Sequence, residues 1–164
     1  MVTRLTRVTH GGAAAIAAAC AVAAMASYAV EGCSAHALIA VALDELEHVV
    51  GEYSAAAVLL ETAQAAGQGA WRPGAEGVPL GATETLAAVL HVLATCGDDA
   101  DGAMRYAVGL GGDTDTVAAI TGGILGCRSA EVRVGWLDQA ILPDAAELDR
   151  VAGGLHEIRR ASYG

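Results

Sequence analysis

Large aromatic side chains are scarce in this chain of 164 residues: phenylalanine is absent, and aromatic residues make up only 4% of the sequence. Alanine and 21 glycines supply much of the bulk instead. Because each small side chain buries little apolar area, a stable core requires many close contacts between its elements. The length is typical of one domain, and we expect residues 1–164 to form a single domain.

Basic side chains are also few, nine against 19 acidic ones, which gives a net charge of −10. The sequence has no basic stripe of the kind that binds nucleic-acid phosphates, so we expect no nucleic-acid partner. An uncharged run, residues 11–30, is mostly alanine and too weakly apolar to predict a membrane span. Arg4 and Arg7 before the run and Ala-Ser-Tyr-Ala near its end resemble a signal peptide, but the weak apolarity of the run favours a cytoplasmic protein with no membrane partner.

Zinc-site spacings and strand patterns are both missing from the sequence. None of the four cysteines belongs to a C-x-x-C pair, and no histidine spacing completes a zinc site. The cysteines are therefore interpreted as small buried thiols in a reducing compartment. No stretch alternates apolar and polar residues as a half-buried strand does, which excludes a sheet. The sequence thus predicts an all-α fold.

Helical periodicity, together with glycine and proline breakers, predicts eight helices joined mostly by short connections. The expected ranges are 12–28, 34–50, 54–66, 83–96, 98–108, 114–126, 130–141 and 144–160. Side chains at four helix starts are interpreted as N-caps, because their oxygens can accept from free backbone N–H groups. These are Ser34, Thr83, Asp98 or Asp99, and Asp144.

The one long loop that the sequence predicts, residues 67–81, contains five glycines and two prolines. Loops of this length inside a compact domain are often binding elements or lids. Trp71 in this loop either pins it to the body or stacks on a ligand. His91 lies beside the apolar stripe of the next helix, where a hydrogen-bonded, partly buried histidine is favoured over a metal or substrate ligand.

Residues 111–116, Gly-Gly-Asp-Thr-Asp-Thr, place two glycines and a cluster of oxygen ligands at the start of an apolar helix. Glycines let the backbone turn tightly and pass close to a ligand or another chain segment. Free N–H groups and the helix dipole favour negative charge there. Three interpretations stay open: an Asx turn that caps the helix, a divalent-cation site, and a phosphate site, which two carboxylates disfavour unless a metal intervenes.

The segment 109–126, GLGGDTDTVAAITGGILG, resembles the C-terminal signature of the ADP-ribosylglycohydrolase family. Thr9-His10 before an alanine-rich helix resembles the family's T-H segment, and residues 84–90 resemble the helix that precedes the signature. Trp136 and Pro143 resemble the tail of the family loosely. The resemblance implies an all-α orthogonal helical bundle, in agreement with the periodicity.

The resemblance also implies a cleft with two Mg²⁺ ions, for which Mn²⁺ could substitute. The matching positions are Asp113, Asp115 and Thr116 for the metal, and His10, Gly111 and Gly112 for the substrate. The implied reaction is hydrolysis of the glycosidic bond at ribose C1 of an ADP-ribosylated protein or a related ADP-ribosyl compound. Two cations can polarise ribose hydroxyls and deliver a water nucleophile. No residue is assigned a catalytic role.

Three family segments, T-D-D, G-D-A-x-G and G-N-G-A-x-M-R, are not found in the sequence. In the family they supply the rest of the metal shell, an acidic catalytic residue and much of the substrate loop. The chain is therefore interpreted as a C-terminal half, inactive alone, that acts with a separate N-terminal half or self-associates. The alternatives are a non-catalytic module that binds ADP-ribose or Mg²⁺, and a purely structural helical module.

Overall fold

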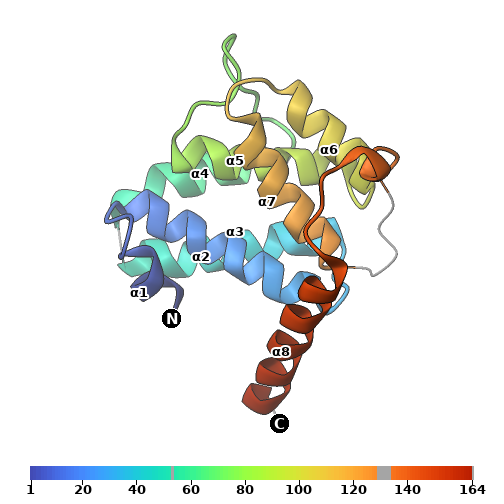
Figure 1. Ribbon diagram of the computed structural model, residues 1–164. Coiled ribbons are helices and arrows are strands. Elements are labelled where there is room, and N and C mark those ends of the chain that lie inside the picture. The colour runs from blue at the N-terminus through green and yellow to red at the C-terminus, as the bar shows by residue number, and fades with distance from the viewer. Residues whose placement is uncertain (53, 129–133, 164) are drawn as a thin grey trace. The chain divides into compact units, whose positions relative to one another are not determined.

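The computed structural model describes residues 1–52, 54–128 and 134–163. Throughout these ranges the regular elements are helices and no strand is present, which confirms the all-α prediction. The first of two compact units, residues 1–133, is a helical bundle (Figure 1). Its elements are α1 (Val2–Thr6), α2 (Ala13–Ala29), α3 (Ala35–Glu52), η1 (Ser54–Ala56), α4 (Ala57–Gly67), α5 (Ala82–Cys96), α6 (Ala100–Gly109) and α7 (Thr114–Gly126).

Helix α5 is the central helix of this unit and packs against α2, α3, α4, α6 and α7. Every residue from 85 to 93 is buried. A helix that is buried around its whole circumference belongs to the interior of a protein. The buried surface is wider than the single stripe that the sequence predicts for Leu86, Val89, Leu90 and Leu93, because neighbouring helices cover all sides of α5.

Alanine is frequent among the buried residues of α2 and α3, which pack along each other (Figure 1). Ala17, Ala21 and Ala29 of α2 and Ala42 of α3 are fully buried. Small side chains let two helices approach closely, so dispersion contacts replace the area that larger residues would bury. The core is therefore built from many small contacts, as the composition predicts.

Three of the predicted N-caps are confirmed. The distance from a backbone N–H nitrogen to the capping side-chain oxygen is 3.3 Å for Ser34, 3.0 Å for Asp99 and 2.8 Å for Asp144. The prediction for Thr83 is wrong, because α5 begins at Ala82 after Gly81. The carbonyl of Gly81 accepts both the N–H and the hydroxyl of Thr85, at 2.9 Å each, and this closes the first turn of α5.

Asp98 takes a different role from the cap of its own helix. Its carboxylate accepts from the Ala35 N–H at 2.8 Å and from Arg128 Nη1 at 2.6 Å. Arg128 also donates to the carbonyl of Cys33. These bonds join the start of α3, the turn between α5 and α6, and the end of α7.

The predicted helix over residues 130–141 is wrong in its described part. Residues 134–136 are not helical, and only the 3-10 turn η2 (Leu137–Gln139) follows. Residues 130–133 lie outside the described residues. Glycine inside a helix costs about 0.5–1 kcal/mol relative to alanine, and between Gly135 and Pro143 the stretch is too short for a stable helix. Helix α1 is not predicted by the sequence because its five residues show no periodicity.

The second compact unit, residues 134–164, contains η2 and α8 (Ala145–Tyr163). The apolar stripe of α8 is exposed, with 45% to 66% of each side chain accessible: Leu148, Val151, Leu155 and Ile158. Within the described ranges, every helix is too short or too polar to cross a membrane. That residues 1–164 form a single domain stays a prediction.

Candidate functional site

The glycine pair that precedes α7 is clamped to the backbone of the long loop at Val78. The Val78 N–H donates to the Gly111 carbonyl and the Asp113 N–H donates to the Val78 carbonyl, each at 2.9 Å. Gly111 and Gly112 have φ of +73° and +72°, in the left-handed region that favours glycine. A Cβ on Gly112 would overlap the backbone of Val78. The close approach that the sequence predicts for this glycine pair is therefore to another segment of the chain.

Asp113 stands at the N-cap position of α7, but its carboxylate makes no capping bond to the backbone of that helix. It accepts instead from the hydroxyl of Thr116, at 2.7 Å. Asp113 is half-buried, and Thr116 is exposed. The Asx-cap interpretation therefore does not describe this carboxylate, because its Oδ1 accepts from a side-chain hydroxyl of α7 and not from a backbone N–H.

A cleft of about 630 Å³ lies against this turn. Its wall is largely apolar and comes from α2, α5 and α7, while α1 and the following turn add two polar groups, Thr6 and His10. The remaining lining residues are Ala15, Ala18, Ala19, Val22, Leu80, Ala82, Thr85, Leu86, Asp113, Thr116 and Ile120. Asp113 is the one carboxylate among these lining residues, so the cleft presents negative charge at one place on an apolar wall.

The cleft brings together three of the six site residues that the sequence predicts: His10, Asp113 and Thr116. His10 Nδ1 lies 2.9 Å from the hydroxyl of Thr9, and its N–H donates to the Thr6 carbonyl at 2.8 Å, so local bonds orient it. Asp115 is exposed in the first turn of α7 and lies outside the lining residues.

Gly111 and Gly112 also lie outside the lining residues, in the turn that carries Asp113. Their part in substrate binding and that of Asp115 in metal binding stay predictions. The structure shows a shaping role for the glycine pair, through its close contact with Val78.

The donor atoms at the turn are of the type that Mg²⁺ prefers, since carboxylate and hydroxyl oxygens are hard ligands. Mg²⁺ commonly keeps several waters and takes only one or two protein carboxylates, together with groups of the substrate. Asp113 and Thr116 fit that partial role. Among the described residues, however, no group of three histidine, cysteine, aspartate or glutamate side chains could hold a metal ion. That Asp113 and Thr116 bind a metal therefore stays a prediction.

His91 is hydrogen-bonded, as the sequence predicts, but it is fully buried rather than partly buried, and it does not line the cleft. Its Nε2 lies 2.9 Å from Arg72 Nη1 and 3.0 Å from the hydroxyl of Tyr106. Burial lowers the pKa of His91, and the nearby Arg72 cation lowers it further. The Trp71 ring packs on His91 with centroids 5.9 Å apart. Of the two interpretations of Trp71, this contact supports the one that pins the loop.

Sequence reasoning missed Val78 and the α2 wall as parts of the site. The wall has a signal in the sequence, since Ala15, Ala18, Ala19 and Val22 recur at helical spacing and share one face of α2. Val78 has none, because its role rests on backbone atoms that every residue carries. The close backbone approach at the neighbouring Gly77 is likewise visible only in the structure, where its φ is +86°.

With this geometry in place, the comparisons with known proteins identify the family. The family model described as ADP-ribosylglycohydrolase matches residues 1–163. No curated protein and no solved structure matches the chain. The family acts on ADP-ribosylated substrates and is generally metal-dependent. Because the match extends over nearly the whole sequence, the chain belongs to the ADP-ribosylglycohydrolase family, and its function is of the glycohydrolase type.

Proposed function

We propose that the cleft binds the ADP-ribose group of an ADP-ribosylated protein or a related ADP-ribosyl compound, and that the chain takes part in hydrolysis of the glycosidic bond at ribose C1. One observation carries the proposal. His10 and the pair Asp113–Thr116 are about a hundred positions apart in the sequence, yet they line one cleft.

The polar groups of the cleft have distinct tasks in this proposal. Asp113 and Thr116 would hold a divalent cation, Mg²⁺ or Mn²⁺, with Asp115 as a further ligand from the same turn. Such an ion supplies Lewis-acid chemistry: it polarises ribose hydroxyls and lowers the pKa of a bound water. The Thr116 hydroxyl fixes the Asp113 carboxylate by a 2.7 Å bond, so the carboxylate is oriented before a ligand arrives.

The wall and the rim serve binding rather than bond cleavage. The apolar surface of α2, together with Leu80 and Ile120, excludes water and offers contact area to the flat face of a base. His10 offers a polar ring nitrogen at the rim. In the reaction, water adds at C1, the bond from C1 to the leaving nitrogen or oxygen breaks, and the leaving group takes up a proton.

A second candidate is a module that binds ADP-ribose without cleaving it. It is favoured by the incomplete ligand set, since no three metal-binding side chains cluster within the described ranges. On this account the cleft and the Asp113–Thr116 pair recognise ADP-ribose through one ion. Hydrolysis would then require metal ligands from another chain.

Calorimetric titration with ADP-ribose, in Mg²⁺ and then in EDTA, tests the proposal. We expect binding in Mg²⁺, loss of that binding in EDTA, and at least about tenfold weaker binding by Asp113→Asn. The matched control is Asp44→Asn, which removes an exposed carboxylate on α3. Release of ADP-ribose from an ADP-ribosyl-arginine or ADP-ribosyl-serine peptide then separates the hydrolase from the binding module. If folded protein binds no ADP-ribose in either buffer, the proposal is wrong.

A further inference from the structure

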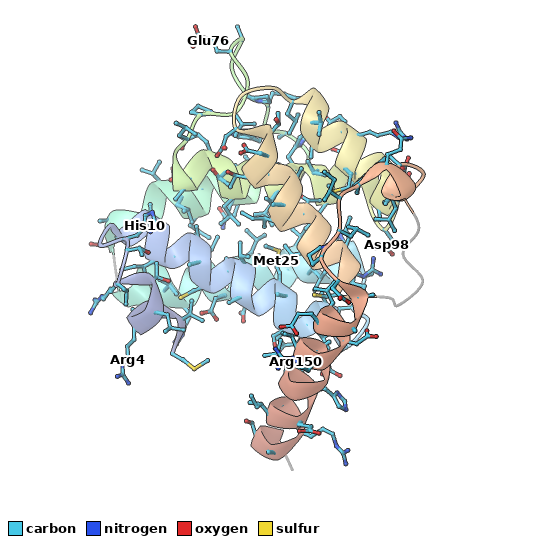
Figure 2. The ribbon with its side chains drawn as sticks, viewed as in Figure 1. Arg4, His10, Met25, Glu76, Asp98 and Arg150 are labelled. Carbon is cyan, nitrogen blue, oxygen red and sulfur yellow. The ribbon has the colours of Figure 1, made fainter. Side chains whose placement is uncertain are left out.

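The long loop of the first unit acts as a strap, here defined as residues 69–81, that is fixed to the body at two points. Figure 1 shows the loop projecting beyond the helices, and Figure 2 shows Glu76 at its tip. Residues 74–76 are exposed. At the tip, a 3.0 Å bond from the Gly77 N–H to the Gly74 carbonyl closes a tight turn. The position of the strap therefore depends on what holds its two legs.

The first leg is held by Arg72 and the buried His91. Arg72 Nη1 donates to the carbonyls of Gly69 and Trp71, at 2.8 Å and 2.7 Å, and to His91 Nε2 at 2.9 Å. His91 is fully buried in α5, and the hydroxyl of Tyr106 on α6 lies 3.0 Å from its Nε2. A single guanidinium thus joins two strap carbonyls to the central helix.

The second leg is held at Val78, which is 2% exposed. Its N–H and carbonyl both bond to the turn that carries Asp113. Gly77 reinforces the contact, because a Cβ on this residue would overlap the backbone of Gly111 and Gly112. Leu80, two residues after Val78, lines the cleft. One short segment therefore touches the signature turn and the cleft wall together.

We propose that Arg72 and His91 are positioning residues for the site: they fix the strap, and the strap, through Val78, fixes the turn that presents Asp113 and Thr116 to the cleft. The inference rests on the proposed function for the ligand role of those two side chains. The geometric part stands on the hydrogen bonds alone. Neither Arg72 nor His91 lines the cleft, so their effect on ligands is indirect.

The variant Arg72→Met tests the inference, because it keeps the length of an exposed side chain and removes its donors. The control is Arg105→Met, which removes an exposed arginine of α6 whose ion pair is with Asp101, one turn away. Amide hydrogen exchange is followed at Val78 and Asp113, the two donors of the clamp, and at Leu90 in the core of α5. A Mg²⁺ titration, read from the amide signals of residues 112–117, is recorded for all three proteins.

In Arg72→Met we expect exchange at Val78 and Asp113 to be about tenfold faster, with exchange at Leu90 unchanged. We expect Mg²⁺ binding to weaken about tenfold, the low end for loss of groups that orient metal ligands. Arg105→Met should match the wild type in both measurements. Unchanged exchange at Val78 and Asp113 would overturn the inference, as would an equal acceleration at Leu90. If the wild type itself shows no Mg²⁺ shifts, the metal proposal fails, and the exchange rates alone decide the positioning role.

Discussion

Replacing Gly112 by alanine, with Gly111→Ala as its matched control, measures the strength of the contact between the strap and the signature turn. Both glycines have nearly the same φ, +72° and +73°, so both variants pay the same left-handed penalty of about 1–2 kcal/mol. They differ in space. A Cβ at 111 has its nearest neighbour, the Gly77 Cα, at an ordinary 3.6 Å, whereas a Cβ at 112 overlaps the backbone of Val78.

The overlap in Gly112→Ala is relieved only if Val78 moves away, and this breaks the two bonds of Val78 to Gly111 and Asp113. Each is worth about 0.5–1.5 kcal/mol net, so Gly112→Ala should lower the free energy of unfolding by about 1–3 kcal/mol more than Gly111→Ala. Domains of this kind are stable by about 5–15 kcal/mol, so both variants should fold.

Urea unfolding followed by circular dichroism gives the two free energies. We expect the slope of free energy against urea concentration to stay constant and the midpoint to fall in the order wild type, Gly111→Ala, Gly112→Ala. Losses that agree within about 0.5 kcal/mol, the usual error of such comparisons, would refute the claim that the strap clamps the turn.

Three further predictions concern pH, a helix cap and the core. Because the pKa of the buried His91 is lowered by burial and by Arg72, the unfolded chain binds the proton first as pH falls through the ordinary histidine value. Stability should therefore decrease below pH 6.5 or so and level off below the folded pKa. Urea midpoints at pH 7.5 and 5.5 should differ less in His91→Gln than in the wild type, and an equal difference would contradict this account. Asp99→Ala removes the 3.0 Å cap of α6 and should lower the free energy of unfolding by about 1 kcal/mol. Thermal melts measure this loss with Asp44→Ala as control, and equal melting temperatures of the two variants would contradict the capping role. Leu90→Ala removes a fully buried side chain of α5 and should lower the free energy of unfolding by about 2–5 kcal/mol. Leu80→Ala, at an exposed position, should lower it far less. Similar losses for the two variants on urea unfolding would contradict the central, buried position of α5.

The helices that the sequence predicts well are those with strong local signals. The apolar residues from Leu86 to Leu93 recur at helical spacing, and Ser34 and Asp99 place side-chain oxygens at helix starts. Local chemistry therefore determines these elements. Thr83 carries the same kind of signal, but the prediction that it caps a helix is wrong. The first turn of α5 is closed instead by bonds from the N–H and hydroxyl of Thr85 to the Gly81 carbonyl. Residues 134–141 form only the 3-10 turn η2 and no α-helix, because Gly135 and Pro143 bound a short stretch.

The candidate site divides in the same way. The motif and its family resemblance predict Asp113, Thr116 and His10 as site residues, because these residues carry recognisable side-chain chemistry, and all three line the cleft. The turn that carries Asp113 is held by the N–H and the carbonyl of Val78. Backbone groups leave no trace in composition or periodicity, so that part of the site becomes visible only in three dimensions. Parts of the site that depend on side chains can be predicted from the sequence, whereas parts that depend on backbone hydrogen bonds cannot.

Under the proposed function, the alanine wall of the cleft has a consequence for how substrate preference can change. Ala15 and Ala19 project from one face of α2 toward the cleft, with no polar partner to satisfy. Exchanging either for a longer aliphatic residue would narrow the cleft without disturbing a hydrogen bond. The lower helix propensity of the longer residue would destabilise α2 by only a few tenths of a kcal/mol or so. If the cleft binds the ligand as proposed, single substitutions along this face of α2 are expected to change the size of ligand accepted, while the bundle and the Asp113 turn stay as they are.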